Sequence, residues 1–353
     1  MTDFTMTVGD DGVAIITWDC PGKSMNVMSA TGFAELDALV DQVLGDDAIK
    51  GAVITSGKRD FAGGMDLNVL AGWKAEGGDN PAPLIFDGIL SGHAAMRKIE
   101  RAGMDPKTLK GGKPIVAALP GIAMGIGYEI ALACHRIFAA DNPKGKIGLP
   151  EIMVGLFPGG GGTTRLVRKM GVMAASSYLL EGKTVEPAKA KAAGLIDEVV
   201  PADELLTAAR TWVLDAKDTD LVKPWDLKGY KMPGGAPYHP AGFMTYVGAT
   251  AMVHSKTQGV YPAAKAMLSA VYEGALVPFD TAIKIEARWF ANLLLNPSSS
   301  AMINSLFINK GALEKGASRP AGVPDQTVKK LGVLGAGMMG AGIALVSALA
   351  GIE

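Results

Sequence analysis

Two glycine-rich turns are the first features of this sequence whose residue types and spacing could do chemistry. FAGGMDL at residues 61–67 follows an apolar run, and GIAMGIGYE at residues 121–129 leads into another. Glycines allow tight turns that leave amides pointing outward, and a helix start presents unpaired N–H groups. If the two turns meet in space, their amides could hold one developing oxyanion, each donor typically contributing ~2.7–4 kcal/mol in the transition state. Taken alone, each turn is more simply explained as packing, because glycine is the usual turn residue.

Two glutamates in apolar surroundings add to this pattern. Glu129 falls one turn inside a helical stretch that is otherwise apolar, and Glu151 stands between the apolar runs of residues 146–162. Glutamates are rarely buried without a purpose. A poorly solvated carboxyl has a raised pKa, which suits general acid–base work near neutral pH. The pattern equally allows a buried glutamate satisfied by backbone amides, or a glutamate on a surface turn.

The composition of the whole chain favours a compact α/β enzyme. Its 353 residues include 34 Lys and Arg against 35 Asp and Glu, a balance that gives no support for nucleic-acid binding. Hydrophobic residues make up 48%, with 46 glycines and only 6% aromatic residues, so small side chains fill the core. The length suits one large domain or two ordinary ones.

The cysteines and the N-terminus favour a reducing compartment. Cys20 and Cys134 are the only cysteines, and we expect each to be a buried free thiol. Together with four scattered histidines they make no metal-ligand cluster. The first basic residue is Lys23, whereas signal and transit peptides need early positive charge, so no targeting segment is expected.

Strand and helix signals alternate up to about residue 200, which predicts an α/β layer architecture. Residues 72–112 are interpreted as irregular segments around one helix, and residues 125–140 as a glycine turn entering a helix. The remaining signals are β-branched runs and one capped amphipathic stretch. They predict strands at 12–18, 50–57 and 113–121, and a helix within 29–47.

The character of the sequence changes in its last third. Residues 215–240 are rich in Pro, Gly, Lys and Asp, and a helical pattern returns over residues 260–310. GASRPAGVPDQ at residues 316–326 is typical of a linker. A further strand is expected at residues 329–335, KKLGVLG.

The central stretches, residues 113–140 and 147–171, resemble the signature of the enoyl-CoA hydratase/isomerase (crotonase) superfamily. FAGGMDL is similar to that family's first oxyanion loop, and the similarity covers residues 10–200 in consistent order. The GLPE form and a following GxGxxG strand more closely resemble the α subunit of bacterial multifunctional fatty-acid oxidation complexes. There a hydratase domain precedes a 3-hydroxyacyl-CoA dehydrogenase.

The resemblance implies a fold and a domain order. The fold is an α/β crotonase-like spiral of repeated ββα units with a helical C-terminal extension, followed by the first strand, turn and helix of a Rossmann domain. The hydratase core is expected at residues 1–200, the helical extension and linker at 201–325, and the incomplete NAD-binding domain at 326–353.

The resemblance also implies roles for particular residues. The amides of Met65 and Ile126 would hold the thioester oxygen of an enoyl-CoA. Glu129 would activate the water that adds to the β-carbon, and Glu151 would deliver the proton to the α-carbon. The implied CoA or substrate contacts are Gly63, Gly64, Asp66 and Gly125.

Ile126, Met65 and Pro120 depart from the residues usual in the family, which are Gly, Ala and Asn. Because only the N–H groups of the first two are needed, these changes bear on acyl specificity more than on mechanism. Enoyl-CoA isomerase activity through Glu151 is implied as a secondary function. The alternatives are another CoA enzyme, such as a hydrolase, and a non-catalytic docking region for a thiolase.

The last stretch of the chain has two interpretations. The 22 residues from Leu331 to Ile352 carry no charge and could span a bilayer. GAGMMG at residues 335–340, however, stands between a strand-like and a helix-like stretch, which is the context of the dinucleotide fingerprint. We favour that interpretation. The NAD site would be incomplete, because the acidic residue expected about 20 positions further on is missing. Its members are Gly335, Gly337, Met339 and Gly340.

These observations lead to expectations about cofactors and partners. The sequence is interpreted as the N-terminal part of a longer protein, without dehydrogenase activity of its own. The hydratase step needs no cofactor, whereas the missing dehydrogenase domain would use NAD. We expect an acyl-CoA substrate, an oligomer with a thiolase β subunit as a candidate partner, no nucleic acid, no transmembrane segment and a bacterial cytoplasmic location.

Overall fold

The computed structural model describes residues 2–320, 322–324 and 327–353. Its internal contacts divide the chain into unit 1, Met1–Phe307, and unit 2, Ile308–Glu353, which are described separately below. The expected linker at 316–326 includes residues 321, 325 and 326, which lie outside the described residues. The proposed division of the chain at residues 200 and 325 stays a prediction.

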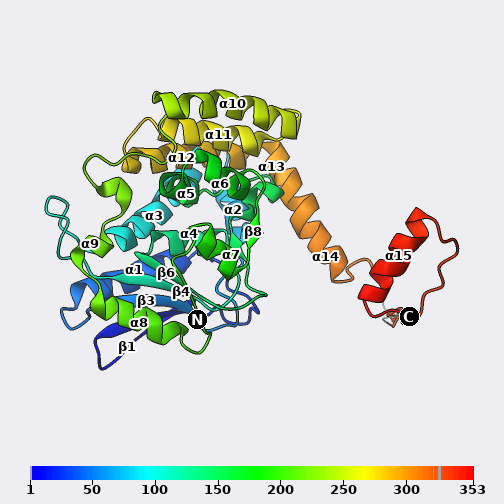
Figure 1. Cartoon of the computed structure of the whole chain (residues 1–353), viewed down its shortest axis with the longest axis horizontal. Helices are drawn as coiled ribbons and strands as arrows, with labels where there is room; N and C mark the ends of the chain where they lie inside the picture. The colour runs from blue at the N-terminus through cyan, green and yellow to red at the C-terminus, as the bar shows by residue number, and fades with distance from the viewer. Residues whose placement is uncertain (1, 321, 325–326) are drawn as a thin grey trace. The chain divides into compact units, whose positions relative to one another are not determined.

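Unit 1 is built on a six-stranded sheet of order β1-β2-β3-β4-β6-β9 (Figure 1). Every neighbouring pair is parallel except β1 with β2. The strands are β1 (Phe4–Val8), β2 (Val13–Trp18), β3 (Gly51–Ser56), β4 (Ile115–Leu119), β6 (Arg136–Ala140) and β9 (Glu198–Val200). A second sheet of order β5-β7-β8 joins β5 (Ala123–Met124), β7 (Ile147–Gly148) and β8 (Thr184–Val185).

Both faces of the large sheet are covered. Val53 and Val116 pack with Leu205 and Val213 of α8 (Leu205–Asp215) in one apolar cluster. Ile54 and other side chains on the opposite face join the main core. Because successive strand residues point to opposite faces, a mostly parallel sheet buried on both sides has nearly continuous apolar strands.

Helices surround the sheet and continue beyond it. They are α1 (Gly32–Gly45), α2 (Leu67–Glu76), α3 (Ala82–Arg101), α4 (Ile126–Ala133), α5 (Gly162–Met170), α6 (Val172–Leu179), α7 (Pro187–Ala192), α8, α9 (Asp218–Leu221), α10 (Pro240–Thr257), α11 (Pro262–Gly274), α12 (Phe279–Leu295) and α13 (Pro297–Met302). Shorter turns are η1 (Pro150–Val154) and η2 (Pro224–Asp226), with a π-helical stretch η3 (Ile303–Asn309). In Figure 1, α10, α11 and α12 lie in succession, and α12 packs on α3 and α5 of the core.

Three segments differ from the expected elements. Residues 72–112 are mostly helical, because Gly77 and Pro81 stand at the ends of α2 and α3 while Ile85, Ile89 and Met96 form one buried face. The helix expected through residue 140 ends at Ala133, since Cys134 is extended and the next residues pair with β4. Sequence analysis made no prediction for α10. Elsewhere in unit 1 the expected α/β architecture is confirmed, and both cysteines are buried and free as predicted.

In unit 2 the structure assigns α14 (Lys310–Glu314) and α15 (Met338–Leu349). The strand expected at 329–335 does not form as an element, because among the described residues only Glu353 bonds to this stretch. The Glu353 N–H donates to the Lys329 carbonyl, and the Leu331 N–H donates to the Glu353 carbonyl. This is the hydrogen-bond pattern of two parallel strands. No helix in the described part of the chain is long and apolar enough to cross a membrane.

Candidate active site

The two glycine-rich turns lie side by side. The Met124 N–H donates to the Ala62 carbonyl at 3.0 Å, and the Ala62 N–H donates to Ile122, also at 3.0 Å. A Cβ placed on Gly125 would lie 3.4 Å from the Gly64 Cα. Gly125 and Gly64 have φ of +55° and +122°, where side chains are disfavoured, so glycine is required for the close approach. The two turns therefore meet in space, which is the condition that an oxyanion site requires.

Two backbone amides are free at this meeting point. Ile126 is the first residue of α4, so its N–H lies among those that the helix leaves unpaired. Gly64 and Asp66 on either side of Met65 both bond to Met28 at 3.0 Å, and this turns the Met65 N–H away from Met28. Neither N–H has a hydrogen bond to another of the residues that the structure describes.

Glu129 lies in the first turn of α4 and is buried. Its Oε1 accepts from the N–H groups of Gly160 and Gly162 at 2.9 and 2.8 Å. Burial raises the pKa of Glu129 to about 7, although those two N–H groups and the charge of Arg165 favour the carboxylate. A carboxyl that titrates near neutral pH, in a fixed orientation, is suited to act as a general base.

Glu151 lies in η1, and its carboxyl approaches Gly125 in the glycine turn before α4. Its Oε1 would lie 3.1 Å from a Cβ on Gly125. Its Oε2 is buried and has no hydrogen-bond partner among the described residues. Burial, followed by the charge of Glu129, raises the pKa of Glu151 well above its ordinary value. The site thus pairs a carboxyl that keeps its proton with one that loses it near neutral pH.

Two of the residues that the family resemblance assigns to CoA binding, Gly63 and Asp66, have structural roles within this chain. The Gly63 N–H donates to Asn26 at 2.8 Å and joins the turn to the preceding loop. Asp66 caps α2 by accepting from the Asn68 N–H at 3.0 Å, and it pairs with Lys23 at 2.9 Å. Contacts of these residues with CoA stay predictions.

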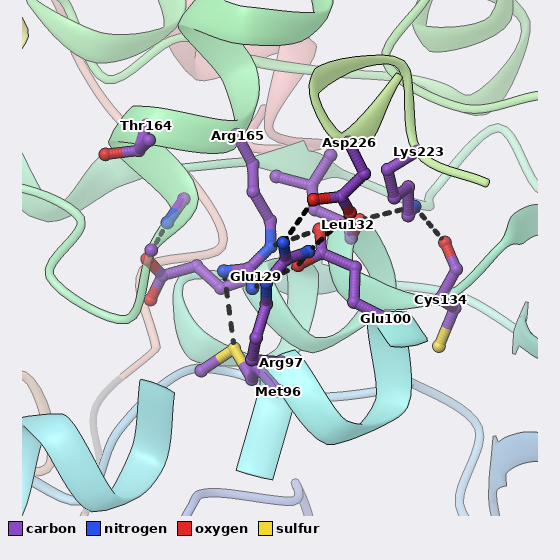
Figure 2. A network of polar contacts seen from close by, with 12 residues as sticks. Met96, Arg97, Glu100, Glu129, Leu132, Cys134, Thr164, Arg165, Lys223 and Asp226 are labelled. Carbon is purple, nitrogen blue, oxygen red and sulfur yellow. Dashed lines mark hydrogen bonds and ion pairs between the residues drawn. The ribbon is translucent and has the colours of Figure 1, made fainter. Parts of the chain in front are cut away.

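A buried ion network lies next to Glu129. Glu100 and Arg165 are fully buried and joined at 3.1 Å, and Arg97 binds Glu100 at 2.9 Å. Figure 2 shows the guanidinium groups of Arg97 and Arg165 turned toward Glu100 and Asp226. Arg165 also donates to the Gly160 carbonyl at 3.3 Å. The network therefore ties α3, α5 and η2 to the turn that holds Glu129.

Glu286 on α12 is a buried carboxyl that sequence analysis missed. It accepts from the N–H groups of Gly161 and Thr164, and Gly161 lies between the two glycines that donate to Glu129. The signal was present, since Glu286 shares a helical face with the apolar residues Ile283 and Phe290. A charged residue within an apolar stripe marks a buried polar contact.

The GxGxxG sequence at residues 335–340 forms a turn that leads into α15 of unit 2. Gly335 has φ +100°, Gly337 caps α15, and Met339 lies in the first turn of that helix. A Cβ on Gly340 would lie 1.8 Å from the Gly335 carbonyl oxygen, so the helix approaches the turn closely. That approach is the reason for the third glycine of the fingerprint. Binding of NAD by these residues stays a prediction.

Gly125→Ala should reduce turnover by roughly tenfold or more, because it adds strain and places a methyl group beside Glu151. The matched control is Gly194→Ala. Gly194 also has positive φ, but open space surrounds its Cβ position, so only the strain is shared. Steady-state kinetics of both variants measure the difference. Unchanged turnover in Gly125→Ala would show that the meeting of the turns is not needed.

The fold and the site together define an α/β domain of the crotonase type. Residues 93–219 match the family model of enoyl-CoA hydratase/isomerase. The chain is 34% identical over 345 residues to the fatty acid oxidation complex subunit alpha of Shewanella baltica, covering 98% of this chain and 46% of that protein. The match of residues 93–219 to the enoyl-CoA hydratase/isomerase family agrees with the predicted resemblance, and the chain spans about half the length of the curated relatives it matches.

Solved structures share the fold. An enoyl-CoA hydratase from Mycobacterium avium subsp. paratuberculosis has a TM-score of 0.56 at 21% identity, covering 87% of this chain and 96% of that one. Human mitochondrial delta3-delta2-enoyl-CoA isomerase has a TM-score of 0.59 at 19% identity, covering 89% of this chain and 100% of that one. At these identities the likeness concerns the fold alone.

Proposed function

We propose that unit 1 adds water across the 2,3 double bond of a trans-2-enoyl-CoA, the hydration step of fatty-acid β-oxidation. One observation carries the proposal. Two backbone N–H groups without partners among the described residues lie close to two buried carboxyl groups, one of which loses its proton near neutral pH while the other keeps it. The family match and the similarity to a fatty acid oxidation complex subunit support the same chemistry.

The residues divide the reaction between them. The amides of Met65 and Ile126 hold the thioester oxygen, which makes the β-carbon electrophilic. The Glu129 carboxylate takes a proton from water as the hydroxyl adds to the β-carbon. The electrons move to the thioester oxygen, and Glu151 then gives its proton to the α-carbon. Exchange with solvent returns both carboxyls to their starting states.

Isomerase activity is a second function of the same site. A double bond can move along the acyl chain if one group removes a proton and returns it to another carbon. Glu151 supports this function in its carboxylate form, because its Oε2 is unpartnered within the described residues and could accept a proton. Glu129 would not be needed for that reaction.

The remaining proposals concern the whole protein. The similarity to a subunit of a fatty acid oxidation complex supports a longer polypeptide that oxidises the 3-hydroxyacyl-CoA product with NAD. It also supports assembly into an oligomer, with a thiolase β subunit as partner, in the bacterial cytoplasm. The NAD pyrophosphate would then contact the residues of the glycine fingerprint, Gly335, Gly337, Met339 and Gly340.

Hydration can be tested by mixing the purified chain with crotonyl-CoA and longer 2-enoyl-CoA thioesters. We expect the ultraviolet absorbance of the conjugated thioester to fall as 3-hydroxyacyl-CoA forms. Binding of the thioester without any fall in absorbance would instead support a docking role.

The pH dependence of hydration should report the ionisation of Glu129. Because burial raises the pKa of this base to about 7, kcat/KM should rise with pH through about 7 and level off above it. The sign follows from the need for the carboxylate form. A pH series of initial rates measures this limb, and a flat profile between mildly acidic and mildly basic pH would contradict the assignment.

A further inference from the structure

We propose that Glu286 is a positioning residue that holds the turn Gly160–Gly162 in the shape that binds and orients Glu129. The inference rests on the proposed function, because its effect is read through the hydration step. Glu286 lies on α12, more than 150 positions after Glu129 along the chain, and comes from the helices that pack on the core in Figure 1.

The contacts of Glu286 are those of a cap supplied by another helix. Its Oε1 accepts from the Gly161 N–H at 2.6 Å. Its Oε2 accepts from both the N–H and the hydroxyl of Thr164, at 2.8 and 2.6 Å. The N-cap residue of α5 is Gly161, which has no side chain to offer. Glu286 therefore satisfies donors at the start of α5 that the helix cannot pair itself.

Successive N–H groups of the turn Gly160–Gly162 donate alternately to the carboxyl groups of Glu129 and Glu286. Gly160 and Gly162 donate to Glu129, whereas Gly161 between them donates to Glu286. The peptide planes cannot rotate independently, so the orientation of the Gly161 N–H restricts its neighbours. Glycine at position 161 has φ +93° and imposes no side-chain restraint of its own. Glu286 supplies the restraint that the four-glycine sequence lacks.

The carbonyl groups of the turn are held from a different side. His93 bonds to the Gly159 carbonyl at 2.7 Å, and Arg165 donates to the Gly160 carbonyl at 3.3 Å. The Gly160 carbonyl and the Gly161 N–H belong to one planar peptide group, so Arg165 holds that group by its oxygen and Glu286 holds it by its N–H, with the shorter contact. Burial and then the charge of Glu129 raise the pKa of Glu286 to about 8, so the two carboxyls are electrostatically coupled across the turn. This coupling supports the geometric argument.

The test compares Glu286→Gln with Lys284→Gln, which removes a charge from the exposed face of the same helix. In Glu286→Gln we expect kcat for crotonyl-CoA hydration to fall about 10–100-fold with KM within about twofold, because a general base is displaced. Lys284→Gln should keep the kcat of the wild type. Thr164→Val removes only the hydroxyl contact with Glu286, and should lower kcat about threefold to tenfold.

A second reaction separates positioning from general damage. With butyryl-CoA in deuterium oxide, the carboxylate form of Glu151 can remove an α-proton, exchange it with the solvent and return a deuteron to the same carbon. Glu129 takes no part in this exchange. If Glu286 acts through Glu129, Glu286→Gln and Thr164→Val should lower hydration by the factors given above but retain exchange within about twofold. Mass spectrometry of the recovered thioester measures the deuterium.

The outcomes are distinguishable. Equal loss of hydration and exchange in Glu286→Gln and Thr164→Val would mean a merely structural role and overturn the inference. Normal hydration in both variants would overturn it as well. If Glu286→Gln fails to fold, Thr164→Val decides alone by the same two reactions. Absence of hydration in the wild type would instead refute the proposed function.

Discussion

Replacing Glu151 by glutamine is expected to lower kcat for enoyl-CoA hydration by ~10²–10⁴-fold with little change in KM, and Glu129→Gln should do the same. Glutamine keeps the shape of each side chain but can neither accept a proton from water nor deliver one to carbon. The two losses have different causes, because Glu129 acts as the base and Glu151 as the acid. Steady-state kinetics and pre-steady-state product formation measure both.

Glu181→Gln is the matched control for these variants. Glu181 is a half-exposed glutamate paired with Lys256, and surface pairs contribute little. Its kinetics should match the wild type. Circular dichroism of all three variants checks that the fold is kept. Near-normal hydration in either Glu129→Gln or Glu151→Gln would remove that residue from the mechanism, whatever the other variant does.

The largest effect on stability is expected for Glu100→Gln, which should lower the free energy of unfolding by roughly 3–5 kcal/mol. Glu100 is the carboxylate shared by two buried guanidinium groups, those of Arg97 and Arg165. Its neutralisation leaves the fully buried Arg165 without a paired charge. Urea denaturation monitored by tryptophan fluorescence measures the change.

Glu198→Gln gives the comparison for a surface pair. Glu198 binds Arg136 and Lys191 at 2.7 Å, but all three side chains are about one-third exposed or more. Its loss should cost no more than ~1 kcal/mol, because solvent already screens these charges. If Glu100→Gln were no more destabilising than Glu198→Gln, the buried network would not hold the core around the site.

The candidate site could be predicted from the sequence because its signals are local. The glycine turn before α4 lies within a few residues of Glu129, and each glutamate is recognised from the apolar residues beside it. That the turns at Gly64 and Gly125 meet depends on hydrogen bonds between segments 60 residues apart, such as Met124 to Ala62. Only the family resemblance indicated this contact before the structure was known.

Glu286 and the ion network could not be predicted in the same way. The partners of Glu286 lie more than 120 positions away, and no local pattern names Gly161 or Thr164 as its donors. Helix α2 and the first turns of α3 were missed for another reason. Their glycines and prolines suggested irregular structure, whereas Gly77 and Pro81 in fact stand at helix ends, where such residues are favoured.

The most direct test of the proposed function is mass spectrometry of the product formed from crotonyl-CoA in labelled water. In water carrying heavy oxygen, the account predicts one labelled oxygen on the β-carbon of an intact thioester. In deuterium oxide it predicts one deuterium on the α-carbon, and both labels should be lost in Glu129→Gln and Glu151→Gln. Release of free CoA with the heavy oxygen in a carboxylate, or recovery of unlabelled crotonyl-CoA, would contradict it.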